Sequence, residues 1–150
     1  MYIKPKVMRH NESRLQEACV RWFRLQFREY AYMLLSIPNG VLTTESQIKI
    51  LKREGMMPGA ADLLLLVPRQ GYGCLCIEMK TQKGKQQETQ KIWQAEAEKC
   101  GNKYILVRSF EEFTQEVCSY LGVNYSSDLE WQRQQLKKLY QNDTTDTMQY

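Results

Sequence analysis

Residues 74–80 read CLCIEMK, and this stretch decides the fold. Four consecutive apolar residues are typical of a strand that is buried on both faces, yet the run ends with Glu78 and Lys80. Residues i and i+2 of a strand point to the same face, so the two charges share one side of the sheet and Met79 takes the other. A buried charge without a partner is costly, so this pair either neutralises itself or holds something between its members.

A second apolar run, DLLLLVP at 62–68, precedes this strand and is separated from it by RQGY, which predicts a β-hairpin. Aligning the two apolar runs gives a register in which paired residue numbers sum to 140, so that Asp62 faces Glu78. Two opposed carboxylates whose Cβ atoms lie about 5 Å apart repel each other, and one of them tends to hold a proton. A divalent cation between them removes the repulsion, with the backbone carbonyl of Met79 as a further candidate ligand.

Lys80 gains a role in this arrangement, because its ammonium can activate a water molecule or stabilise charge on a phosphate. Together the residues predict a hydrolytic site for a phosphodiester. The alternative is a plain ion pair between Glu78 and Lys80, with Asp62 capping the start of a strand.

The remaining patterns predict an α/β fold in which a mixed central sheet is flanked by helices. The expected order begins with a helix from about residue 11, capped by Asn11 or Ser13, that gives way near Leu34 to a strand at 34–38. A helix at 43–55, the hairpin, a helix at 89–101, a strand at 103–107 and a helix at 109–122 follow. Residues 1–122 form the predicted domain. Residues 123–150 form a polar extension, with a predicted short helix at 128–141 followed by a disordered tail.

The first of these helices offers an independent check of the site. At ~100° per residue, Glu12 and Gln16 fall on or beside its apolar stripe, whereas Glu17 falls nearly opposite and is expected in solvent. A carboxylate on the face that meets the sheet needs a partner, which a metal site would provide. Glu12 could also be a simple N-terminal charge favoured by the helix dipole.

The composition of the chain excludes several classes of function. The 150 residues carry a net charge of +4 and five cysteines without a CxxC pair, so we expect a reduced, intracellular, cytoplasmic protein with no disulfide framework. No apolar run is long enough for a membrane span, and no secretory signal or phosphate-binding GxxxxGK motif occurs, so neither a membrane nor a nucleotide cofactor is expected. His10 is the only histidine and is expected in a flexible N-terminus, which argues against a catalytic histidine.

Basic residues gather in two places that permit nucleic-acid binding, although a solvated charged face would look the same. Lys83, Lys85 and Lys91 follow the charged strand directly and are candidate phosphate contacts. The second group, Lys49, Lys52 and Arg53, lies on the predicted helix at 43–55.

These residues resemble the PD-(D/E)XK nuclease superfamily and, within it, the VRR-NUC family. The resemblance runs from about residue 12 to residue 121, and its pieces come in the family's order: ESRLQ, IPNG, REGMMPGAADLLL, IEMKTQKGK, QETQKIW and RSFEEFTQEVCSYLG. Two departures are Ala61 in place of the superfamily's proline and Met79 between the charges, where many members have Leu or Phe. Neither departure changes a ligand.

The resemblance implies a restriction-endonuclease-like core with a definite set of site residues. Mg²⁺ or Mn²⁺ would bind Asp62, Glu78 and the Met79 carbonyl, Lys80 would be the catalytic lysine, Glu12 would reach the metal or its water, and Gln90 would position substrate or Lys80. Gln16 and Asn39 join the lysines Lys83, Lys85 and Lys91 as candidate DNA contacts.

Short standalone members are similar to virus-borne proteins that act on branched DNA, so the resemblance implies a homodimer that presents two active sites to a four-way junction, encoded by a phage or its bacterial host. Two alternatives remain open. One is a flap, nick or restriction-type nuclease of the same superfamily, although 150 residues leave little room for elements that read bases. The other is a non-catalytic DNA-binding module that has kept the fold.

Overall fold

Four strands form one mixed sheet that lies between helices in the computed structural model, which describes residues 6–38, 44–125, 134 and 137. The spatial order is β1-β2-β3-β4, with antiparallel β1/β2 and β2/β3 pairs and a parallel β3/β4 pair. The elements are, in chain order, α1 (Lys6–Gln26), the 3₁₀ helix η1 (Arg28–Met33), β1 (Leu34–Ser36), α2 (Glu45–Arg53), β2 (Leu63–Leu65), β3 (Leu75–Met79), α3 (Glu88–Lys99), β4 (Lys103–Val107) and α4 (Phe110–Leu121). The predicted α/β class and the predicted order of elements are confirmed.

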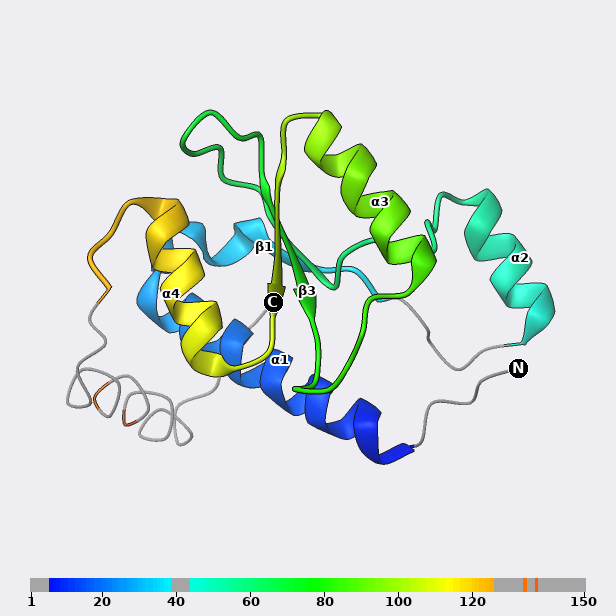
Figure 1. Cartoon of the computed structure of the whole chain (residues 1–150), viewed down its shortest axis with the longest axis horizontal. Coiled ribbons are helices and arrows are strands. Elements are labelled where there is room, and N and C mark those ends of the chain that lie inside the picture. Colours follow the sequence, from blue (N-terminus) through cyan, green and yellow to red (C-terminus); the bar gives the residue numbers. More distant parts are fainter. Residues whose placement is uncertain (1–5, 39–43, 126–133, 135–136, 138–150) are drawn as a thin grey trace.

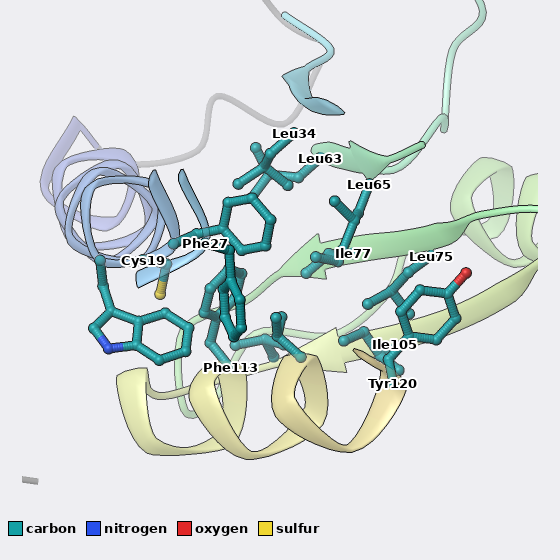
Figure 2. Close-up of a cluster of buried hydrophobic side chains, with 14 of the residues drawn as sticks. Cys19, Phe27, Leu34, Leu63, Leu65, Leu75, Ile77, Ile105, Phe113 and Tyr120 are labelled. Atoms are coloured by element: carbon teal, nitrogen blue, oxygen red, sulfur yellow. The ribbon is translucent and has the colours of Figure 1, made fainter. Parts of the chain in front are cut away.

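The two faces of the sheet have different neighbours, because side chains alternate along each strand. Leu75, Ile77 and Met79 of β3 point into the main hydrophobic core, which α1 and α4 close from outside (Figures 1 and 2). Cys76 points to the opposite face, where it packs with Ala97 of α3 in a smaller cluster. By the same alternation Glu78 lies on the α3 face of the sheet, and this difference separates the charged end of β3 from the main core.

The β2–β3 hairpin has the register that the two apolar runs predict. Leu64 pairs with Cys76, and the flanking pairs have the same residue-number sum of 140. The turn itself is made by Gln70 and Gly71, both with positive φ (54° and 83°), as in the tight turns that suit twisted hairpins. Asp62 and Glu78 therefore lie at facing positions where the hairpin opens toward the site.

The first helix differs from its prediction at both ends. It begins by Lys6, so Asn11, Ser13 and His10 lie inside α1 and neither predicted cap residue is at its start. Residues 6–10 contain no glycine or proline that would interrupt the helix. The preference of Asn11 and Ser13 for the cap position is not enough to start the helix there. At the other end Phe27 leaves helical geometry (φ −120°, ψ 66°), and η1 then leads directly into β1. The apolar periodicity predicts a helix that runs too far, because Phe27 is buried in the core although it lies beyond the end of α1.

The other helices match their predictions closely. Thr44 caps α2, with its side chain accepting a hydrogen bond from Gln47 N–H. Ser109 caps α4 by accepting from Glu112 N–H, and Gly122 ends this helix in the left-handed conformation. Residues 123–125 are not helical, and the predicted short helix at 128–141 lies, apart from residues 134 and 137, outside the described residues.

Candidate active site

The charged tip of β3 is fully enclosed. The side chains of Glu78 and Lys80 are 0% and 3% exposed, and Lys80 Nζ lies 2.7 Å from Glu78 Oε1. The strand pairing that carries them continues one residue beyond β3, since Lys80 N–H donates to Val107 O at 2.9 Å. The two charges thus satisfy each other inside the protein, on a backbone that neighbouring β4 holds in place.

Gln90, in the first turn of α3, is the next residue to reach this pair. Its Nε2 donates a short hydrogen bond to Glu78 Oε1, and its Oε1 accepts from Gln87 N–H at 2.8 Å. Because a backbone N–H can only donate, the second bond fixes which end of the amide faces Glu78. The predicted neighbourhood of Gln90 and Lys80 is therefore present, with Glu78 Oε1 between their donor groups.

Close backbone contact between the loop before β2 and the first turn of α3 holds the start of α3 at this position. Gly59 has φ +84°, and a Cβ added there would lie 2.3 Å from Thr89 O. Only glycine fits such an approach, since the contact is with backbone that cannot swing aside. The segment that leads into β2 thus packs directly on the first turn of α3, next to Gln90.

Asp62 completes the pair of carboxylates that the hairpin register predicts. Its Oδ2 accepts from Met79 N–H at 2.7 Å, which holds the carboxylate across from the end of β3. Burial and then repulsion by Asp62 raise the pKa of Glu78 from 4.5 to about 7, while Lys80 and Tyr104 act in the opposite direction. The two carboxylates are thus close enough to disfavour ionising together.

This donor set fits a magnesium-type ion. Within the described part of the chain no three His, Cys, Asp or Glu side chains group around one point, so the protein offers two carboxylates and the Met79 carbonyl. Magnesium commonly binds through only one or two carboxylates and completes its shell with waters and phosphate oxygens. Repulsion by Asp62 adds to burial in raising the pKa of Glu78, and a divalent ion between the two carboxylates would relieve that repulsion.

Glu12 approaches the same end of β3 from α1. Its Oε1 accepts from Thr81 N–H at 3.3 Å, one residue beyond Lys80. The helical wheel placed Glu12 toward the sheet and Glu17 in solvent, and Glu17 is exposed as expected. Glu12 thus reaches the border of the site from a separate element.

The candidate DNA contacts divide into three groups. Lys83, Lys85 and Lys91 are exposed, and Lys91 forms a surface ion pair with Glu88. Gln16 donates from Nε2 to Ser36 Oγ at 3.3 Å, so its recorded contact is with β1 rather than with the carboxylates. Asn39 lies outside the described residues.

Two contacts of the site were not predicted. Tyr104 of β4 directs its hydroxyl at Glu78 Oε2 (3.4 Å), and Gln86 donates to the same hydroxyl at 3.2 Å. Burial, followed by the neighbouring Glu78, raises the pKa of Tyr104, so this phenol stays protonated and can donate. The second is Arg108, which bonds to the turn after Lys80. No local sequence signal marks either residue, because both contacts depend on the parallel pairing of β3 with β4.

Comparison with known proteins now bears on the whole arrangement. A model of the VRR-NUC domain matches residues 10–111, which is more than half of the chain. The chain belongs to the VRR-NUC family. Among solved structures the chain is similar to a VRR_NUC domain protein, with a TM-score of 0.65 and 19% sequence identity over 75% of this chain and 89% of that one. At this identity the likeness shows the shared fold. No curated protein matches the chain significantly.

Membership of the VRR-NUC family confirms the resemblance seen in the sequence and makes this a nuclease domain of the PD-(D/E)XK type. A nuclease domain has DNA as its partner, and the family implies a divalent metal ion. No helix in the described part of the chain has both the length and the apolar character needed to cross a membrane.

Proposed function

We propose that this protein is a Mg²⁺- or Mn²⁺-dependent endonuclease that hydrolyses phosphodiester bonds in branched DNA, four-way junctions above all, as a homodimer. The observation that carries the proposal is the pair of facing carboxylates, Asp62 and Glu78, with the buried ammonium of Lys80 on the same face of β3. A plain surface ion pair would not be completely enclosed or shared with Gln90.

Each residue has a proposed role. Asp62, Glu78 and the Met79 carbonyl would hold the ion, with Glu12 at its border. When bound, a divalent ion supplies positive charge that stabilises the charge developing on the phosphate in the transition state. Gln90 keeps Glu78 in one orientation, because both ends of its amide are already bonded.

Lys80 is proposed to activate the attacking water and to stabilise charge on the reacting phosphate. Its Nζ is held at 2.7 Å from Glu78 and is screened from solvent, and an ammonium in such a water-poor place acts on nearby charge more strongly than in water. Its position is also fixed in advance, which avoids the cost of ordering a long side chain during the reaction.

DNA would be held by exposed cations. Lys83 and Lys85 follow Lys80 directly, and the basic residues of α2, namely Lys49, Lys52 and Arg53, are also exposed. Such residues bind phosphates without reading bases, so selection by DNA shape suits them. Branched substrates and the dimer come from the family resemblance. A flap, nick or restriction-type nuclease and a non-catalytic DNA-binding module are the competing hypotheses.

The test is cleavage of labelled four-way junction, flap and linear duplex DNA with Mg²⁺, Mn²⁺ or EDTA. We expect paired symmetric cuts in the junction, loss of cleavage in EDTA and in Asp62→Asn, and a fall of about 10²–10⁴-fold in Lys80→Ala, the usual range for a proton-transfer group. Lys99→Ala, an exposed lysine in the last turn of α3, is the matched control and should cleave normally. Light scattering reports whether the protein is a dimer.

The outcomes separate the hypotheses. Cleavage of flap or duplex in preference to the junction would support a nuclease but refute the four-way junction as its preferred substrate. Equal inertness of wild type and variants, with DNA binding intact, would favour the binding module.

A further inference from the structure

Arg108 makes an unusual set of bonds at the end of β4. Its Nη1 donates to Thr81 O at 2.6 Å and to Gly84 O at 2.8 Å, with Gln82 O further away at 3.4 Å. All three carbonyls belong to residues 81–84, the turn that directly follows Lys80, and we call these residues the clamped turn. A single guanidinium nitrogen thus holds both ends of the turn.

Arg108 is itself fixed by two further bonds. Gln82 Nε2 donates back to Arg108 O at 3.1 Å, and Arg108 N–H donates to Glu112 Oε2 at 2.6 Å. Glu112 lies in the first turn of α4, where a carboxylate is favoured. The clamped turn is therefore tied through Arg108 to β4 and α4, two elements that belong to the rigid core.

The clamped turn also packs on Lys80. Gly84 N–H donates to Thr81 O at 3.1 Å, which closes the turn tightly. A Cβ added at Gly84 would lie 3.4 Å from Lys80 Cδ and 3.0 Å from Thr81 Oγ1, so the backbone of Gly84 lies directly against the stem of Lys80. This contact accounts for part of the enclosure that leaves Lys80 only 2% exposed.

We infer that Arg108 is a positioning residue of the nuclease, which holds the clamped turn against Lys80 so that the lysine ammonium stays at Glu78. The catalytic part of this inference rests on the proposed function, whereas the clamping of Lys80 does not. Arg108 acts through the turn, since its recorded bonds are to carbonyls of residues 81–84 and to Glu112 rather than to the carboxylates of the site.

The clamp is tested first by the reactivity of Lys80 in protein without metal or DNA. An amine-acylating reagent is applied in a short pulse, and modification of each lysine is measured by peptide mass spectrometry. Because Arg108→Ala removes the charged donor that holds both ends of the clamped turn, we expect it to raise the labelling rate of Lys80 by about 10-fold or more. Arg108→Lys keeps a cation that can reach some of the carbonyls and should give an intermediate rate. Lys99→Ala removes one exposed positive charge at the far end of α3 and should leave Lys80 protected.

Unchanged labelling of Lys80 in folded Arg108→Ala would overturn the inference, as would the same increase in Lys99→Ala. If Arg108→Ala does not fold by circular dichroism, Arg108→Lys decides the question, and wild-type protection of Lys80 in that variant would equally overturn it.

Kinetics on DNA test the catalytic consequence. Arg108→Ala should lower kcat by about 10-fold or more, because Lys80 is displaced from Glu78 when the clamped turn is released. Lys99→Ala, the matched control outside the site and the clamped turn, should leave both kcat and Kd unchanged. A weaker Kd with unchanged kcat in Arg108→Ala would refute the positioning role. If the wild type cleaves no DNA, the proposed function fails, and the labelling result still judges the clamp.

Discussion

Ionised Glu78 is unfavourable in the folded protein without metal, and Glu78 is also a ligand in the proposed active site; Asp62→Asn separates these two effects. Burial and Asp62 together raise the pKa of Glu78 from 4.5 to about 7. Since one pKa unit corresponds to ~1.4 kcal/mol, ionising Glu78 in the folded state costs on the order of 3 kcal/mol compared with the unfolded chain.

The direction of the pKa shift of Glu78 determines how the stability of the protein changes with pH. A raised pKa means that the folded protein prefers protonated Glu78, so this contribution to stability is complete below about pH 4.5 and is lost as the pH rises through 7. Repulsion between the two carboxylates acts only when both are ionised. Asp62→Asn should therefore change stability at pH 8 and leave it nearly unchanged through this effect at pH 5.

The size of the gain can be bounded from the geometry. Two unit charges about 5 Å apart interact by roughly 1–3 kcal/mol for an effective dielectric constant between 80 and 20. Asp62 is the second cause of the shift after burial, so we take the lower end of this range, about 1 kcal/mol, for its contribution. An asparagine oxygen can still accept the hydrogen bond from Met79 N–H, so the fold around the site is kept.

The assay is urea unfolding in EDTA at pH 5 and pH 8. We expect Asp62→Asn to gain about 1 kcal/mol relative to wild type between pH 5 and pH 8, while losing DNA cleavage. Glu17→Gln removes an exposed carboxylate from the same protein and should show no such pH-dependent gain. A variant that is destabilised equally at both pH values would refute the argument that Asp62 and Glu78 repel each other.

Two further predictions concern the packing that positions the site. Gly59→Ala should lower the free energy of unfolding in urea by at least about 2 kcal/mol more than Gly55→Ala. Both glycines have positive φ, but only at Gly59 would the new Cβ meet backbone, at Thr89 O. Equal losses in the two variants would contradict the close approach at Gly59. Tyr120→Phe should cost about 1–2 kcal/mol, because the buried hydroxyl donates to Val67 O at 2.7 Å and that carbonyl would lose its partner; a neutral result in the same assay would mean that water replaces the bond.

The parts of this structure that could be predicted are those fixed by local pattern. Aligning the two apolar runs gives the register that the structure has, so the facing of Asp62 and Glu78 could be predicted from the hairpin alone. The approach of Glu12 to the end of β3 followed from helical periodicity, since the wheel places it toward the sheet.

The parts that could not be predicted depend on pairing between distant segments. Tyr104 meets Glu78 because β4 pairs in parallel with β3 at a particular register, and nothing in residues 103–107 specifies that register. Arg108 meets the clamped turn for the same reason, one step beyond the end of both strands. The start of α1 escaped prediction for a different reason, because Asn11 and Ser13 are cap-forming residues that here lie within a longer helix.

The two oxygens of Glu78 have different hydrogen-bond partners. One carboxylate could therefore keep its bonds within the protein and also bind the proposed metal ion. Oε1 receives the donors of Lys80 and Gln90, whereas the bond recorded for Oε2 is the long one from the Tyr104 hydroxyl at 3.4 Å. Among the residues that the structure describes, Oε2 has this one weak donor and keeps acceptor capacity, so it is the oxygen on which we expect a cation to act. The bonds to Oε1 can then persist in the loaded enzyme, and the lysine and glutamine need not be rebuilt when the ion arrives. Replacing either oxygen, as in Glu78→Gln, would disturb either the bonds from Lys80 and Gln90 or the proposed binding of the ion.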